Sequence, residues 1–230
     1  MKIGIQNINL GYGSYRVFSD FSIDFEENEI NCILGPSGCG KTSLLNILSG
    51  LTVPDSSGEN HFQGKKISYV FQDPRLLPWM TVRENIAFVL KDILTPPELH
   101  KRVNDYLQMV KLEKFSDLYP KQLSGGMRQR VSLARAFSYP SEIILMDEPF
   151  KGLDIKLKKE MSDAFGVLWN HRKVTVIWVS HDIEEALIPG RNGYIFSQSP
   201  VKILRNFKTT AKNQEELRKE IKEILENQAT

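Results

Sequence analysis

Three apolar runs and the helical patterns between them predict an α/β protein. Residues 30–34, 143–146 and 174–179 are almost continuously apolar, as expected of parallel strands that are covered on both faces. A glycine-rich loop and an amphipathic helical pattern follow the first run, up to Leu45. This order of strand, loop and helix predicts a parallel sheet whose loops gather at the carboxyl ends of the strands.

The first 25 residues have a different pattern. Apolar and polar residues alternate over Lys2–Leu10 and Arg16–Phe25, which predicts two antiparallel strands joined by a turn at 11–14. Tyr12 lies in that turn, upstream of the strand that leads into the glycine-rich loop. Its ring could stack on an adenine base or could simply pack, and the pattern alone leaves both readings open.

A helical unit is inserted from Pro74 to Pro120. Helical spacing of apolar residues runs over 82–94 and 96–110, and Pro96 suits the first turn of a helix. Just upstream, Trp79 is flanked by Leu76, Leu77 and Met80. Such a cluster predicts either core packing or an exposed docking patch.

Near the C-terminus, residues 193–207 suggest a hairpin and residues 214–227 an amphipathic helix that packs on the core.

Composition narrows the class of protein. The chain has 230 residues, 41% of them hydrophobic, and its 30 basic and 28 acidic residues nearly cancel, so charge gives no argument for binding nucleic acid. The longest apolar runs, such as Val176–Val179, fall far short of a membrane span, and the N-terminus lacks a signal-peptide pattern. We therefore expect a soluble intracellular protein in which Cys32 and Cys39 are free thiols.

The segment GPSGCGKTS carries the most specific chemistry. It satisfies the Walker A pattern G-x-x-x-x-G-K-[ST], in which backbone N–H groups wrap the phosphates of a nucleotide. The lysine reaches the β- and γ-phosphates, the threonine hydroxyl can ligate Mg²⁺, and the helix adds its positive N-terminal end. The candidate binding residues are Gly35, Pro36, Ser37, Gly38, Cys39, Gly40, Lys41, Thr42 and Ser43.

Strand ends supply candidate catalytic and metal-binding groups. Asp147 can hold Mg²⁺ while Glu148 polarises an attacking water. Gln72 could reach a metal, a water or the γ-phosphate, or could be a capping residue. His181 could donate to the γ-phosphate.

A second predicted anion site begins a helix. The sequence LSGGMRQR at 123–130 places Ser124 as an N-cap in front of Gly125 and Gly126, whose N–H groups face outward from the positive end of the helix. An ordinary capped helix would have the same local sequence. The pattern by itself does not separate the two.

Taken in order, these motifs resemble those of an ATP-binding cassette (ABC) ATPase over nearly the whole chain. GPSGCGKT is similar to Walker A, LSGGMRQR to the family signature and IILMDEP to Walker B. Gln72 matches the Q-loop, residues 151–154 the D-loop with Asp154, and His181 the switch histidine. Tyr12 matches the adenine-stacking aromatic. Met127 replaces the more usual glutamine of the signature, and Thr42-Ser43 reverses the commoner order while keeping a hydroxyl in place.

The resemblance implies a fold and a division of the chain. It implies a P-loop NTPase (RecA-like) α/β core with an N-terminal antiparallel β subdomain and an inserted α-helical subdomain. Residues 1–73 and 136–230 would form the nucleotide-binding core, and residues 74–135 the helical subdomain with the signature.

The resemblance also implies a mechanism and partners. ATP and Mg²⁺ would be the ligands, with Mg²⁺ on Thr42, Gln72 and Asp147. Two copies, as a homodimer or pseudo-homodimer, would hold each ATP between Walker A of one and Ser124, Gly125 and Gly126 of the other. Separate permease subunits and a solute-binding protein would complete an importer, most like those for nitrate, sulfonate and taurine. The chain would then lie in the cytoplasm, on the inner face of the cell membrane, and would bind no nucleic acid.

Two other functions are open to a chain with these motifs. One is a soluble cassette that acts as a scaffold or mechanical ATPase in iron–sulfur assembly, repair or translation. Repair forms would carry long coiled-coil insertions and translation forms two cassettes, and neither pattern occurs here. The other is a small-molecule P-loop kinase, which would have no use for LSGGMRQR.

Overall fold

A six-stranded sheet forms the centre of the protein. The computed structural model describes residues 1–188 and 190–228. The strand order is β4-β5-β6-β3-β7-β8, formed by Ile67–Val70, Ile143–Asp147, Thr175–Val179, Ile30–Leu34, Asn192–Phe196 and Ile203–Lys208. All neighbouring pairs are parallel except β7–β8. The three apolar runs are thus central strands, as predicted, and β7–β8 is the predicted hairpin.

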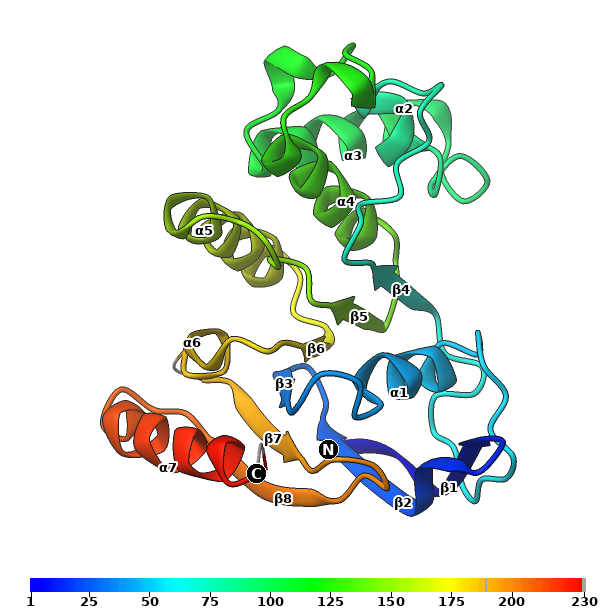
Figure 1. Cartoon of the computed structure of the whole chain (residues 1–230). Coiled ribbons are helices and arrows are strands. Elements are labelled where there is room, and N and C mark those ends of the chain that lie inside the picture. The colour runs from blue at the N-terminus through cyan, green and yellow to red at the C-terminus, as the bar shows by residue number, and fades with distance from the viewer. Residues whose placement is uncertain (189, 229–230) are drawn as a thin grey trace.

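The N-terminal segment, in which apolar and polar residues alternate, forms a second sheet. Strands β1 (Lys2–Tyr12) and β2 (Tyr15–Glu26) pair antiparallel, with Tyr12 opposite Tyr15 at the turn. The loop from Leu51 to Gly64 adds two isolated bridges to β1, at Asn60 and Ser56. Figure 1 shows this hairpin beside α1 (Lys41–Leu48), at the opposite end of the molecule from α2–α4.

The two faces of the central sheet belong to different cores. Alternate residues of β3 divide between them: Cys32 and Leu34 face the helices α4 (Gly125–Ser138), α5 (Ile155–His171) and α7 (Gln214–Glu226), whereas Ile33 faces β1, β2 and α1. This alternation follows from the two-residue period of a strand. The apolar stripe of α7, with Leu217 and Ile221 buried, packs on the first core as predicted.

The remaining helices connect these layers. Helix α3 (Pro96–Met109) begins at the predicted proline, and α6 (Ile183–Ala186) follows β6. Two short 3₁₀ helices, Glu113–Phe115 and Pro120–Gln122, lead into α4. The helices α2, α3 and α4 contact one another and extend away from the sheet (Figure 1).

One predicted helix is shorter than expected. The pattern at 82–94 predicted a continuous helix, but α2 ends at Ala87 (Val82–Ala87) and turns follow. Backbone bonds in these turns alternate between four- and three-residue spans, as at Lys91 and Ile93, while Leu90 stays buried. The spacing of apolar residues therefore predicted correctly that Leu90 is buried, but the helical hydrogen bonding does not continue beyond α2.

Trp79 lies at the surface rather than in the core. Its side chain is 69% exposed, while Leu76 packs against the core and Leu77 is half-buried. Of the two readings of this cluster, core packing is wrong for Trp79.

Candidate functional site

The loop between β3 and α1 owes its shape to glycine at two positions. Gly38 and Gly40 have φ of 77° and 117°, in the left-handed region where a side chain is strained. A Cβ on Gly40 would also lie 2.6 Å from Val17 Cγ1 on β2. The loop can therefore pass close to the hairpin, and α1 begins directly after it with its N-terminal N–H groups turned to the loop.

Lys41 is folded into this loop. Its ammonium is buried and donates to the carbonyls of Gly35 at 2.8 Å and Pro36 at 2.7 Å. The Cys39 thiol is also buried, and burial raises its pKa although Lys41 opposes the shift. Both cysteines are free thiols, as predicted. The lysine charge is thus held at the centre of the loop, within the wrap that phosphates would occupy.

A carboxylate from a neighbouring strand meets the start of α1. Asp147 is the last residue of β5, and its Oδ1 accepts from Thr42 Oγ1 at 3.1 Å. The Tyr69 hydroxyl lies 3.5 Å from Asp147 Oδ2. Burial raises the pKa of Asp147, and the Thr42 hydrogen bond opposes that shift. A buried carboxylate of this kind is stabilised by a nearby cation.

The oxygens of Thr42 and Asp147 fit Mg²⁺. Both are hard oxygen donors, which this ion prefers, and it commonly takes only one or two protein ligands with substrate phosphates and water. In the described ranges 1–188 and 190–228, no three His, Cys, Asp or Glu side chains are grouped closely enough to hold a metal ion alone. The donor set therefore suits a metal shared with phosphates. Thr42 and Asp147 would hold the ion, which would neutralise phosphate charge there.

Glu148 lies beside the same edge. Its backbone has φ of 44°, and its N–H donates to the carbonyl of Val179 on β6 at 3.0 Å. Its carboxylate is 14% exposed and pairs with Lys151 Nζ at 2.6 Å and with His181 Nδ1 at 3.3 Å. The predicted base and the predicted switch histidine are therefore neighbours, although they lie on different strand ends.

Lys41, Thr42 and Glu148 line one cleft of about 280 Å³. Tyr12 is 59% exposed at its mouth, where the ring is free to stack. The lining residues are Tyr12, Tyr15, Val17, Ser37, Gly38, Gly40, Lys41, Thr42, Ser43, Glu148 and Lys151. The cleft combines a phosphate loop, an aromatic ring and an acidic group on one surface.

The other predicted residues lie elsewhere. Gln72 is exposed two residues after β4, which pairs with β5, and it is not among the cleft-lining residues. Ser124 caps α4 by accepting from the N–H of Met127 at 3.2 Å. Gly126 is buried against Leu157 of α5. Asp154 caps α5 in the same way, accepting from Leu157 N–H at 2.9 Å.

Several lining residues escaped the sequence reasoning. Tyr15 and Val17 belong to β2, where the alternation marks a strand but not its approach to the phosphate loop. Lys151 lay within the predicted D-loop without a role of its own. Its position three residues after Glu148, in a turn, is the signal that could have identified it.

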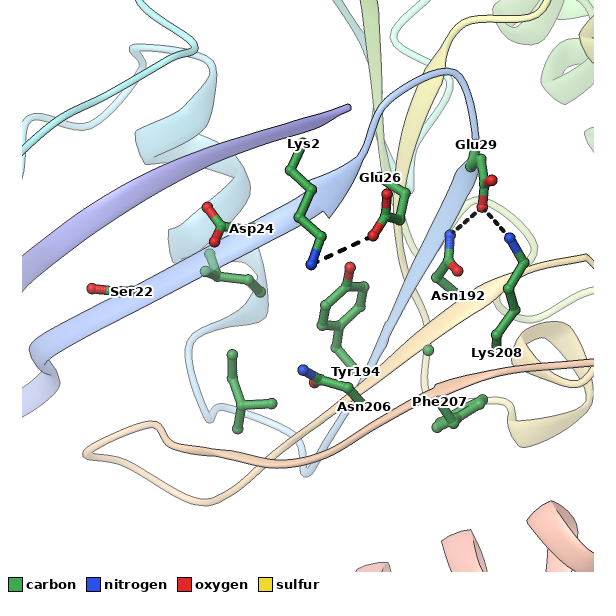
Figure 2. Close-up of a pocket in the computed structure, with 13 residues that line it drawn as sticks. Lys2, Ser22, Asp24, Glu26, Glu29, Asn192, Tyr194, Asn206, Phe207 and Lys208 are labelled. Atoms are coloured by element: carbon green, nitrogen blue, oxygen red, sulfur yellow. Dashed lines mark hydrogen bonds and ion pairs between the residues drawn. The ribbon is translucent and has the colours of Figure 1, made fainter.

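A second groove of about 720 Å³ lies away from these motifs. Figure 2 shows it between β2 and the β7–β8 hairpin, where Lys2 lies toward Glu26, and Glu29 bonds Asn192 and Lys208. Its Tyr194 has a pKa raised by burial and by nearby carboxylates. These charged groups pair with one another, and none of them belongs to a predicted motif.

The comparisons with known proteins agree with the fold. No helix within residues 1–188 and 190–228 is both long and apolar enough to cross a membrane. Two dimeric structures of the cassette MJ0796, one of them in a post-hydrolysis state with ADP and Pi, cover 90% of this chain and 98% of their own. Their TM-scores are 0.74 and 0.75, at 28% and 29% sequence identity.

Sequence relatives include two kinds of import proteins. The sulfate/thiosulfate import ATP-binding protein CysA of Halalkalibacterium halodurans is 40% identical over 201 residues, which is 81% of this chain but 56% of that relative. The aliphatic sulfonates import ATP-binding protein SsuB of Bacillus licheniformis is 37% identical over 212 residues, covering 88% of this chain and 82% of the relative. Residues 18–151 match the family described as ABC transporter. With most of its length aligned to such relatives, the chain belongs to the ABC transporter family, as an ATP-binding cassette ATPase domain.

Proposed function

We propose that this chain binds and hydrolyses ATP with Mg²⁺, as the ATPase subunit of an importer for a small solute. One observation carries the proposal: Lys41, Thr42 and Glu148 line one cleft at the carboxyl ends of β3 and β5, and Asp147 is hydrogen-bonded to Thr42 there. Ligands bind at this edge in open α/β sheets. The family and the MJ0796 structure with ADP and Pi support the choice of nucleotide.

Each group has a defined task in this proposal. The loop N–H groups and Lys41 bind the β- and γ-phosphates, and Thr42 and Asp147 hold the metal ion, which neutralises the phosphate oxygens when bound. Glu148 accepts a proton from the attacking water, and His181, 3.3 Å from it, keeps that carboxylate oriented. Gln72, which follows β4 beside the strand that ends in Asp147, would act on the γ-phosphate and the metal ion from that side of the site.

A second copy would complete the site. Ser124, Gly125 and Gly126 lie outside their own cleft, at the N-terminal end of α4, where N–H groups and the helix end favour an anion. We propose that they cover the ATP of a partner copy, with Asp154 at the same interface. The dimeric MJ0796 structures support this arrangement. In the same proposal, residues 74–135 act as a helical subdomain and 1–73 with 136–230 as the nucleotide-binding core.

The proposed partners are membrane proteins. Relatives named for sulfate, thiosulfate and sulfonate import support a chain that works at the cytoplasmic face of the membrane with separate permease subunits and a solute-binding protein. Small oxyanions are the first substrates to test. The exposed Trp79, with Leu77 beside it, is the surface we propose for contact with the permease.

Calorimetry and phosphate release test the ATPase proposal. Lys41→Ala should weaken ATP binding at least about tenfold, because a charge-assisted contact to phosphate is lost. Glu148→Gln should retain binding but slow phosphate release by roughly 10²- to 10⁴-fold, because the amide does not accept the proton. Lys101→Ala, an exposed lysine of α3, is the matched control and should change neither quantity. Native affinity in Lys41→Ala would contradict the phosphate-loop assignment.

A further inference from the structure

Lys151 places a second ammonium group in the nucleotide cleft. It lines the cleft with Gly38, Lys41 and Thr42, and its side chain is 46% exposed. Its charged partner is Glu148 Oε2, at 2.6 Å. The two lysines differ in their surroundings, because Lys41 is buried in the loop whereas Lys151 stands at the open side of the cleft.

The backbone that carries Lys151 is firmly held. The Lys151 N–H donates to the Glu148 carbonyl at 3.1 Å, which closes a turn, and Glu148 is itself bonded to Val179. Between them, Phe150 is buried and its ring packs edge-on against Trp178 at 4.8 Å between centroids. The turn therefore fixes where the lysine begins, while its four-carbon stem leaves the ammonium free to move by several ångströms.

Glu148 is a partner that this lysine can exchange. In the proposed reaction the attacking water lies between Glu148 and the γ-phosphate, so an ammonium that touches Glu148 is already close to the phosphate oxygens. A terminal phosphate carries more negative charge than one carboxylate and offers several acceptor oxygens. An ammonium that can reach both is therefore drawn toward the phosphate.

We propose that Lys151 is a γ-phosphate-binding residue, held by Glu148 in the absence of ATP and transferred to the γ-phosphate when ATP binds. The transfer frees Glu148 from its cation as the substrate arrives, so the base becomes available to the attacking water only when the γ-phosphate is present. This inference rests on the proposed ATPase function and deepens it. It adds a second γ-phosphate contact to that of Lys41 and so increases the preference of this chain for a triphosphate.

Binding of two nucleotides separates the γ-phosphate from the rest of the ligand. The native protein is titrated with ADP and with a non-hydrolysable ATP analogue, both with Mg²⁺, by calorimetry. Lys151→Met should weaken analogue binding roughly five- to tenfold, since one charge-assisted contact is lost, and leave ADP binding within about twofold. Lys151→Arg, which keeps the charge, should restore analogue binding to within about threefold of native. Lys101→Met is the matched loss of an exposed lysine away from the cleft and should change neither affinity.

The Glu148→Gln background distinguishes direct contact from an indirect effect. If Lys151 contacts the γ-phosphate, Lys151→Met should still weaken analogue binding in that background, where no carboxylate needs a cation. If Lys151 acts only by neutralising Glu148, the loss should vanish there, and the inference is overturned. Lys151→Gln provides a second neutral variant if Lys151→Met folds poorly. If the ratio of analogue affinity to ADP affinity is native in both Lys151→Met and Lys151→Gln, the inference is also overturned. Failure of the native protein to bind either nucleotide would instead contradict the proposed function itself.

Discussion

Asn85 is expected to hold the loop that presents Trp79, and its removal should be costly. This side chain is fully buried at the start of α2. Its Oδ1 accepts from the N–H of Leu77 at 2.8 Å, and its Nδ2 donates to the carbonyls of Leu77, Met80 and Thr81 at 3.1, 3.0 and 3.0 Å. One amide therefore satisfies both backbone groups of Leu77 and closes the loop against the helix.

The magnitude follows from which groups lose their partner. In Asn85→Ala, the Thr81 carbonyl keeps the backbone N–H of residue 85, so its loss is small. The Leu77 carbonyl likewise keeps the backbone N–H of Met80. The Leu77 N–H and the Met80 carbonyl lose the partner that Asn85 supplied, and an unsatisfied buried polar group costs about 1–3 kcal/mol. Water can reach part of this loop, because Leu77 and Met80 are only half-buried. We therefore expect a loss of about 2–4 kcal/mol in the free energy of unfolding.

Urea unfolding measures this loss, and a membrane assay measures its consequence. Asn85→Ala should unfold at lower urea and should co-sediment less with membranes that contain the permease. Phosphate release by the folded isolated chain should stay near the native rate, because Asn85 is not part of the cleft. Gln108→Ala, an exposed amide on α3, is the control and should stay within about 0.5 kcal/mol of native. A loss below about 0.5 kcal/mol in Asn85→Ala would refute the reasoning.

Three further predictions concern the dimer, the permease contact and pH. Mixing Lys41→Ala with Ser124→Arg chains leaves one composite site intact and should restore ATP-dependent association by light scattering; no gain over either variant alone would show that the signature does not act in trans. Leu77→Glu should remain folded and hydrolyse ATP but lose co-sedimentation with permease-containing membranes, and unfolding would instead make Leu77 a core residue. Burial raises the pKa of Asp182, but the hydrogen bond that Lys158 donates to its carboxylate at 2.6 Å keeps this pKa below its usual value. The pair therefore stabilises the fold above about pH 4. Lys158→Met should therefore cost about 0.5–1 kcal/mol at pH 6, and this difference should shrink as pH falls below 4 in urea titrations.

The phosphate loop could be predicted from sequence because its chemistry is local. Gly40, Lys41 and Thr42 are consecutive, and the strand before them and the helix after them follow from apolar period alone. The strand end with Asp147 and Glu148 is local in the same sense. For Asp147 to approach Thr42, the two strands need only lie near each other in a parallel sheet, and their apolar sequences predict such a sheet.

Contacts that depend on strand order were beyond the pattern. Gln72 follows β4, and nothing in the sequence states that β4 is the edge strand, with β5 and β6 between it and β3. His181 follows β6, which borders both β3 and β5, so its side chain reaches Glu148. The two residues have similar local sequences, and the order of the sheet decides which strand ends lie beside each of them. Asn85 was missed for a related reason, since its partners lie in a loop without periodicity.

The same non-local contacts connect the predicted motifs to one another. At the C-terminal half of α4, the Arg135 guanidinium donates to the carbonyls of Pro74 and Arg75, each at 3.1 Å. The segment that follows Gln72 is thus bonded to the helix that Ser124 caps, and the chain then runs into the loop held by Asn85. A displacement of the Gln72 segment relative to α4 must break two hydrogen bonds to a charged group, each worth about 1.5–3 kcal/mol. Movement of α4 with that segment breaks neither, so Gln72, the signature helix and the proposed permease contact are most readily displaced together.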